Sequence, residues 1–281
     1  MNAHLPDIIL EPLVRAALME DLGQFGDVTT RAVVPAGTRY RARIVAREEG
    51  VVSGMQMARL AFKLVDPQLE ISVLCEDGMT CNRGDVLMTI AGDAASILSG
   101  ERVALNFAGR MAGIATMTAA FVSKAVGTQA KITCTRKTTP GLRVVEKQAV
   151  LHGGGSSHRF SLSDAILIKD NHIAAAGGIG PVLTAVRQNA SHMVRVEIEV
   201  DRIDQLQEVL NVGGADVVLL DNMTTETLAE AVRLVGGRLV TEASGNMNLG
   251  RIAEVAATGV DFISVGALTH SSKVLDFGLD F

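Results

Sequence analysis

Hydrophobic and polar positions follow two different rhythms along this chain. In roughly the first hundred residues, one stretch with helical spacing is followed by short alternating runs, separated by turns that contain Gly and Asp. The predicted helix covers residues 10–19, and the predicted strands cover residues 40–47, 71–75 and 86–90. This part is therefore expected to form a small sheet with a few helices.

The rest of the chain repeats a longer unit. An Ala- and Met-rich stretch at residues 101–125 predicts a helix, after which near-continuous apolar runs alternate with segments of helical spacing. The predicted strands are residues 131–135, 165–169, 194–200, 216–221, 238–242 and 261–265, and the later helices are residues 180–189, 203–212, 225–235 and 249–258. Such repetition indicates a parallel sheet covered by helices.

Polar or reactive side chains follow nearly every one of these parallel strands. In a closed barrel the carboxyl ends of all strands meet at one mouth, whereas in an open sheet only those near the switch point converge. Because the reactive groups are spread over six strands, the pattern favours a barrel over an open doubly wound sheet.

Composition narrows the classes of function. The chain has 281 residues with a net charge of −5, and only 3% of them are aromatic, which argues against a nucleic-acid partner. No apolar stretch reaches the ~18–20 residues of a membrane span, and residues 1–7 do not resemble a signal peptide. We therefore expect no membrane partner and a cytoplasmic location.

Positive charge is concentrated in the middle of the chain. Residues 101–172 hold ten Lys or Arg against four Asp or Glu, so that the remainder carries a net charge of −11. A basic segment in an acidic protein indicates either a site for a small anionic ligand or a solvated charged face.

Two motifs in this segment offer groups that bind anions. Thr135, Arg136 and Lys137 follow a predicted strand; Arg can hold a carboxylate through two parallel hydrogen bonds, while Lys acts as a point charge. His158 and Arg159 follow three glycines, whose backbone amides can approach an anion. Either motif could also be an ordinary surface loop.

Charged groups close three apolar strands. Lys169 is costly there unless it faces a cavity or a partner, and the alternative is a surface pair with Asp170. Glu199 and Asp221 could bind Mg²⁺ that is held largely through water and substrate oxygens. They could equally bind ribose hydroxyls, or pair structurally with cations. Glu197 lies on the same strand face as Glu199, so the pattern alone does not exclude Glu197 from the same site.

Small residues stand at the ends of the last two strands and leave room for a phosphate held by backbone N–H groups, although single glycines there are also explained by tight turns. These residues are Ser244, Gly245, Asn246, Ser264, Val265 and Gly266. The chain has no Ser-His-Asp, Cys-His or zinc pattern. Together, the motifs predict a phosphorylated sugar and an anionic co-substrate.

Eight ordered segments resemble the quinolinate phosphoribosyltransferase family, also called nicotinate-nucleotide pyrophosphorylase (carboxylating). The segments are ERVALNF, TRKTTPGLR, EKQAVLHGGGSSHR, LIKDNHI, EIEV, LLDNM, EASGN and DFISVGALTH. The resemblance implies an α/β fold, with an N-terminal α/β sandwich at residues 1–102, to which residues 271–281 return, and an incomplete parallel α/β barrel at residues 103–270. The implied reaction transfers phosphoribose from phosphoribosyl pyrophosphate to quinolinate and releases pyrophosphate and CO₂, which gives nicotinate mononucleotide for NAD biosynthesis.

The resemblance also implies roles for individual residues. The implied catalytic residues are Lys137, Lys169, Glu199 and Asp221, with Mg²⁺ held at the two acids mostly through water and substrate. The implied quinolinate ligands are Arg136, His158, Arg159 and Lys169, beside Thr135. Ser244, Gly245, Asn246, Ser264, Val265 and Gly266 are implied to bind the 5′-phosphate. A homodimer, or a higher oligomer, is implied in which Arg102 enters the neighbouring subunit's active site.

Three alternatives stay open at this point. The chain could belong to the paralogous branch found with molybdate transporters, use nicotinate itself as the substrate, or be a non-catalytic sugar-phosphate binder. The segment LIKDNHI resembles the quinolinate enzymes better than the molybdate-associated branch.

Overall fold

The computed structural model describes residues 4–281, which form two compact units. The first unit contains residues 4–119, 138–154 and 271–281, and the second contains residues 120–137 and 155–270. The domain limits inferred from the sequence, at residues 102 and 270, stay a prediction.

The first unit is built on an antiparallel sheet. Its strands are β1 (Arg39–Ala46), β3 (Glu70–Val73), β5 (Val86–Asp93) and β12 (Phe277–Asp280), in the order β12–β1–β5–β3. Alternation places Ala42 and Ile44 of β1 in the core. Since β12 pairs with β1, the C-terminal strand belongs to this sheet. A separate short pair consists of β2 (Gly50–Val51) and β4 (Thr80–Cys81).

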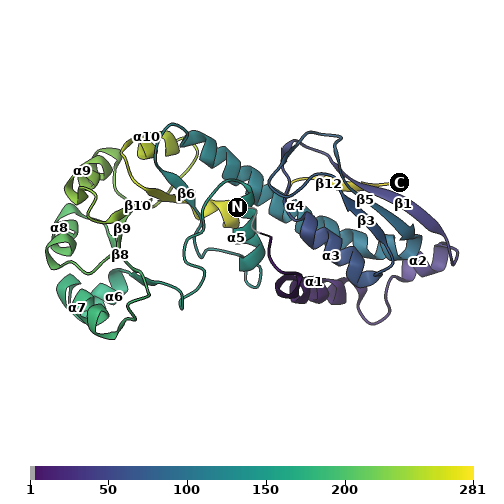
Figure 1. The fold of residues 1–281 in the computed structure, drawn as a ribbon, viewed down its shortest axis with the longest axis horizontal. Helices are drawn as coiled ribbons and strands as arrows, with labels where there is room; N and C mark the ends of the chain where they lie inside the picture. Colours follow the sequence, from purple (N-terminus) through teal and green to yellow (C-terminus); the bar gives the residue numbers. More distant parts are fainter. Residues whose placement is uncertain (1–3) are drawn as a thin grey trace. The chain divides into compact units, whose positions relative to one another are not determined.

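The first unit also contains helices. They are α1 (Asp7–Leu22), α2 (Val28–Val33), α3 (Met55–Val65), α4 (Ala94–Lys124, of which residues 120–124 belong to the second unit) and α5 (Arg143–His152). Of these, α2 and α3 lie beside the sheet (Figure 1). Helix α3 begins after Gly54, whose φ is 94°. A Cβ there would lie 2.9 Å from Cα of Ala108 on α4. Glycine therefore allows the two helices to approach closely.

The second unit contains six parallel strands. They are β6 (Lys131–Thr133), β7 (Ile166–Ile168), β8 (Val196–Val200), β9 (Val217–Asp221), β10 (Val240–Ser244) and β11 (Phe262–Ser264), in the order β6–β11–β10–β9–β8–β7. The helices are α6 (Asp170–Ala176), α7 (Ile179–Asn189), α8 (Ile203–Val212), α9 (Thr225–Val235), α10 (Ile252–Ala257) and α11 (Ala267–His270). Figure 1 shows α7 to α10 outside the curved sheet.

The barrel is incomplete because the sheet's edge strands, β6 and β7, do not pair with each other. The segment that leads into β7 runs beside β6 instead, where Ser156 bridges to Thr133. The predicted fold class, an N-terminal α/β sandwich followed by an incomplete parallel α/β barrel, is confirmed.

Apolar side chains of the parallel strands pack under the helices. Ile198, Val218 and Leu220 are fully buried on the strands, and Leu206 on α8 and Val255 on α10 are fully buried on the helices. The opposite sheet face carries the polar residues described below. Within residues 4–281, no helix combines the length and apolarity needed to cross a bilayer.

Candidate active site

The carboxyl ends of the six parallel strands surround a cavity of about 980 Å³ in the second unit. Most of the predicted site residues line it: Thr135, Arg136, Lys137, His158, Arg159, Lys169, Glu199, Asp221, Ser244, Gly245, Asn246, Ser264 and Gly266. Their side chains or backbone come from all six strand ends, as the barrel interpretation requires.

Strand alternation explains why these residues face the same side. Glu199 pairs in register with Leu219, which in turn pairs with Glu242, so three neighbouring strands present these side chains at one level. Asp221 and Ser244 pair two residues further along. All five line the cavity.

Two predicted residues do not line the cavity. Arg102 is exposed on α4, within the first unit. Val265 is 1% exposed, and its N–H donates to the carbonyl of Thr133 on β6, which continues the strand pairing. The roles of Arg102 and Val265 in binding stay predictions.

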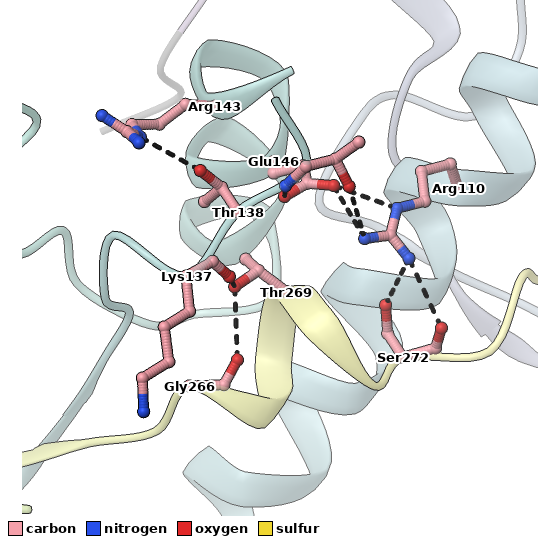
Figure 2. Close-up of polar contacts among 9 residues, drawn as sticks. Arg110, Lys137, Thr138, Arg143, Glu146, Gly266, Thr269 and Ser272 are labelled. Carbon is pink, nitrogen blue, oxygen red and sulfur yellow. Dashed lines mark hydrogen bonds and ion pairs between the residues drawn. The ribbon is translucent and has the colours of Figure 1, made fainter. Parts of the chain in front are cut away.

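Backbone contacts hold Lys137 in place in the loop after β6, and Figure 2 shows the contact with Thr269. The hydroxyl of Thr269 donates to the carbonyl of Lys137 at 2.7 Å, and the N–H of Lys137 donates to the hydroxyl of Thr135 at 3.0 Å. A Cβ at Gly266 would lie 3.1 Å from Cδ of Lys137, so the glycine leaves room for the Lys137 side chain.

Lys169 forms an ion pair with Glu199 on the neighbouring strand β8 rather than with Asp170. Its Nζ lies 2.5 Å from Oε2 of Glu199, and its side chain is 46% exposed. The backbone N–H of Lys169 donates to Nδ1 of His172 at 2.9 Å, so that His172 fixes the start of α6. The position of Lys169 at a strand end is thus explained by a carboxylate partner and an open cavity.

His158 lies between two buried carboxylates. Its Nε2 is 3.0 Å from Oε2 of Glu197 and 3.6 Å from Oε1 of Glu242. Burial raises the pKa of Glu242 to about 7, and the charge of Glu197 adds to this effect, while His158 opposes it. Of the residues described, these three form the one group of three or more His, Cys, Asp and Glu whose potential metal-ligand atoms lie within 4.8 Å of one another.

Arg159 is positioned by a backbone contact and by nearby charges. Its Nη1 donates to the carbonyl of Ala165 at 3.1 Å. Burial holds the pKa of its guanidinium below the usual range, the charge of Arg136 lowers it further, and Glu197 raises it. Two guanidinium groups side by side are costly unless an anion lies between them, which favours a negatively charged ligand.

The residues that follow β9 and β10 line the cavity and have left-handed backbone conformations. Asn222, Gly245 and Asn246 all have positive φ angles, of 55°, 94° and 49°. A Cβ at Gly245 would lie 2.2 Å from Oδ1 of Asn222, so this position requires glycine. Successive residues in such conformations form concave surfaces that suit anions such as a phosphate.

Comparison with known proteins agrees with this geometry. Residues 27–112 match the family model for the quinolinate phosphoribosyl transferase N-terminal domain, and residues 114–280 match the model for its C-terminal domain. The chain belongs to the quinolinate phosphoribosyl transferase family.

Full-length relatives and solved structures of this family are similar to the chain throughout. It is 42% identical to a probable nicotinate-nucleotide pyrophosphorylase (carboxylating) of Bacillus subtilis, over 96% of the chain and 93% of that protein. It is also 42% identical to a quinolinate phosphoribosyltransferase (decarboxylating) of Nicotiana tabacum, over 99% of the chain and 83% of that protein. The crystal structure of NadC from Streptococcus pyogenes superposes with a TM-score of 0.96 at 38% identity and covers 99% of this chain and 98% of that one.

Several residues at the family's cavity were not predicted from the sequence. Asn248 and His270 line it, and Glu242 lines it beside His158. Glu242 ends the predicted strand at residues 238–242, and the strand-end signal marks it as a charged group, but the sequence assigns it no role. His270 follows the short helix α11, where nothing in the local pattern marks it.

The glycine run before Ser156 has a different role from the anion nest expected of it. None of the three glycines lines the cavity. Gly153 ends α5, and a Cβ there would lie 2.3 Å from the carbonyl oxygen of Ala115 on α4. At Gly153 the requirement for glycine therefore comes from the packing of α5 against α4.

Proposed function

We propose that this chain transfers phosphoribose from phosphoribosyl pyrophosphate to quinolinate, with loss of CO₂, and so forms nicotinate mononucleotide for NAD biosynthesis. The observation that carries the proposal is that Arg136, Arg159 and Lys169 meet Glu199 and Asp221 in one cavity. Its volume of about 980 Å³ is at the upper end of ligand sites, as two substrates bound together require.

Quinolinate fits the basic side of the cavity. It carries two carboxylates on adjacent carbons of a pyridine ring, next to the ring nitrogen. Arg136 and Arg159 can each hold a carboxylate through paired hydrogen bonds, and Lys169 and His158 add charge beside them. Binding a dianion also relieves the repulsion between Arg136 and Arg159.

The phosphorylated sugar fits the opposite side. We place its 5′-phosphate at the turn formed by Ser244, Gly245 and Asn246, near Ser264 and Gly266, and its ribose hydroxyls near Glu199 and Asp221. Lys137 would then face the pyrophosphate.

Mg²⁺ suits the two acids at this position because it prefers carboxylate oxygens and keeps several waters. Glu199 and Asp221 lie at the carboxyl ends of β8 and β9, adjacent strands at the same cavity edge. When bound, the ion would neutralise charge on the departing pyrophosphate.

The chemistry requires positioning and charge more than acid–base catalysis. The bond between C1 of the ribose and the pyrophosphate oxygen breaks, and the ring nitrogen of quinolinate bonds to C1. The positive nitrogen of the resulting pyridinium stabilises the electron pair that stays on C2 when the 2-carboxylate leaves as CO₂, and a proton from solvent then bonds to C2. Fixed cations at the carboxylates would orient the ring nitrogen toward C1.

An assay with the purified chain tests this proposal. Quinolinate, phosphoribosyl pyrophosphate and Mg²⁺ should yield nicotinate mononucleotide and one CO₂ per turnover. Turnover of nicotinate in place of quinolinate would assign the other substrate, and binding of either substrate without turnover would indicate a sugar-phosphate binder. A molybdate-associated function is not favoured by the relatives' names.

We further propose a homodimer, or a higher oligomer, in which Arg102 completes the active site of the neighbouring subunit. Support comes from the family motif and from the exposure of Arg102 outside the cavity of its own chain. Arg102→Ala should be inactive alone, and mixing it with inactive Lys169→Ala should restore part of the activity, because one site in each mixed dimer is intact. Lack of restoration in verified mixed dimers would contradict the shared site.

A cytoplasmic location is part of the same proposal. It stays a prediction, which cell fractionation would test.

A further inference from the structure

Two buried carboxylates beside the cavity have no part in the chemistry proposed above. Glu197 and Glu242 are 6% and 4% exposed, and both approach Nε2 of His158, at 3.0 and 3.6 Å. One oxygen of each, Oε1, is buried without a hydrogen-bond partner among residues 4–281. Two carboxylates in so little water are costly if both are ionised, so a shared proton stabilises the group.

The surroundings indicate which of the two acids takes that proton. Arg159 lies close enough to Glu197 that each stabilises the charge of the other. Glu242 has no such cation on its neighbouring strands: Leu219 of β9 and Phe262 of β11 stand opposite it, and Ser264 offers only a hydroxyl. Its charged neighbours are His158 and Glu197, which oppose each other.

We propose that binding of the dianionic pyridine dicarboxylate is coupled to the uptake of one proton from solvent by the pair His158 and Glu242. This inference rests on the proposed function, because it takes quinolinate as the ligand. Two negative charges that enter beside His158 and Arg159 favour protonation of both members of the pair. The proton offsets one of the two negative charges of the ligand next to the buried carboxylates.

A proton fits this position better than a metal ion does. The three side chains could ligate a transition metal, since their ligand atoms lie within 4.8 Å of one another. However, Arg159 already lies near Glu197, and Arg136 lies near Arg159. A dication added among these fixed cations would be repelled, whereas a single proton is shared at lower cost.

The sign of the pH dependence follows from the free protein. The pKa of Glu242 is about 7 before the ligand binds and rises in the complex. Affinity for quinolinate should therefore be highest below pH 7 and fall as pH rises from 7 toward the pKa of the complex. We expect Kd to increase roughly threefold or more per pH unit over this window. The carboxylates of quinolinate are fully ionised throughout it.

Calorimetry of quinolinate binding to the full chain tests the coupling directly. Titrations at pH 7.5 in HEPES and in Tris, which differ in ionisation enthalpy and carry no phosphate, should give different binding heats that correspond to uptake of about half a proton or more. Equal heats in the two buffers would overturn the inference and leave the proposed function intact. Absence of any binding would overturn both.

Variants of Glu242 test which side chain takes up the proton. Glu242→Gln keeps the size of the side chain but cannot titrate, so proton uptake should vanish and Kd should become independent of pH. Glu230→Gln is the matched control, an exposed acid on α9, and should retain the uptake of the original chain. Undiminished uptake in folded Glu242→Gln would overturn the role of Glu242.

Two measurements on the unmodified chain keep the inference testable if Glu242→Gln does not fold. An infrared difference spectrum on adding quinolinate should gain a protonated carboxyl band, and its absence would remove Glu242 as the acceptor. Elemental analysis of protein purified without chelator should find no stoichiometric transition metal. A metal held at His158 would contradict the shared proton.

Discussion

The two units distribute their charged side chains differently. In the first unit, ion pairs such as Arg47–Asp280 and Arg15–Glu11 lie at the surface, with every side chain more than a third exposed. The second unit also has surface pairs such as Arg202–Asp204, but there Lys169–Glu199 faces a cavity and His158 contacts buried carboxylates. The topology explains the contrast, because successive antiparallel strands end at opposite edges of a sheet, whereas all parallel strands end at the same edge.

One pair in the first unit does not follow this contrast. Arg110 on α4 contacts Glu146 on α5 at 2.7 Å, and the Glu146 side chain is fully buried (Figure 2). The other oxygen of Glu146 accepts from the N–H of Thr139 at 3.0 Å, and Arg110 also donates to the hydroxyl of Ser272. This pair connects three separate parts of the chain within the unit, so its contribution should be to stability.

The largest effect should come from removing a cation at the cavity. Arg136→Ala and Lys169→Ala should each lower kcat/KM by about 100-fold or more, because charges that hold the substrate in a closed site are worth several kcal/mol. Circular dichroism and the urea midpoint should stay close to those of the original chain. Arg202→Ala, which removes a cation with a 59% exposed side chain, is the control and should leave kcat/KM unchanged. A loss of less than tenfold in either cavity variant would contradict the assigned site.

A smaller effect, on stability rather than activity, is expected at the buried pair of the first unit. Arg110→Ala leaves the Glu146 carboxylate buried without its cation, which should lower the free energy of unfolding by about 3–5 kcal/mol. Urea denaturation measures the change, and Arg15→Ala on α1 serves as the exposed-pair control. A loss below about 1 kcal/mol would mean that Glu146 is hydrated or protonated in the native state.

The smallest effect should be seen at the surface pair Arg47–Asp280. Both side chains are more than a third exposed, so water and salt screen their attraction. Arg47→Ala should shift the thermal midpoint by no more than about 2 °C. A much larger shift would show that surface charge in the first unit matters as much as buried charge, and would remove the contrast between the units.

Repeating elements of the second unit could be predicted closely from the sequence. The predicted helices at residues 203–212 and 225–235 coincide with α8 and α9, and each predicted parallel strand overlaps an observed one. Their signal is local, since burial on both sheet faces produces continuous apolar runs. In contrast, α5 was not predicted, because Glu146, Lys147 and Gln148 are buried in its middle and interrupt the apolar pattern.

The fold class, the family and most of the side chains that line the cavity could be inferred before the structure was known, because strand periodicity and strand-end residues are local properties. Only the tertiary structure decided that Glu197 and Glu242 meet at His158. These acids lie on β8 and β10, which are separated by β9, so no spacing along the chain predicts their proximity. The curved parallel sheet turns both side chains toward its interior. There, the distance between the two carboxylates and their removal from water determine whether both are ionised.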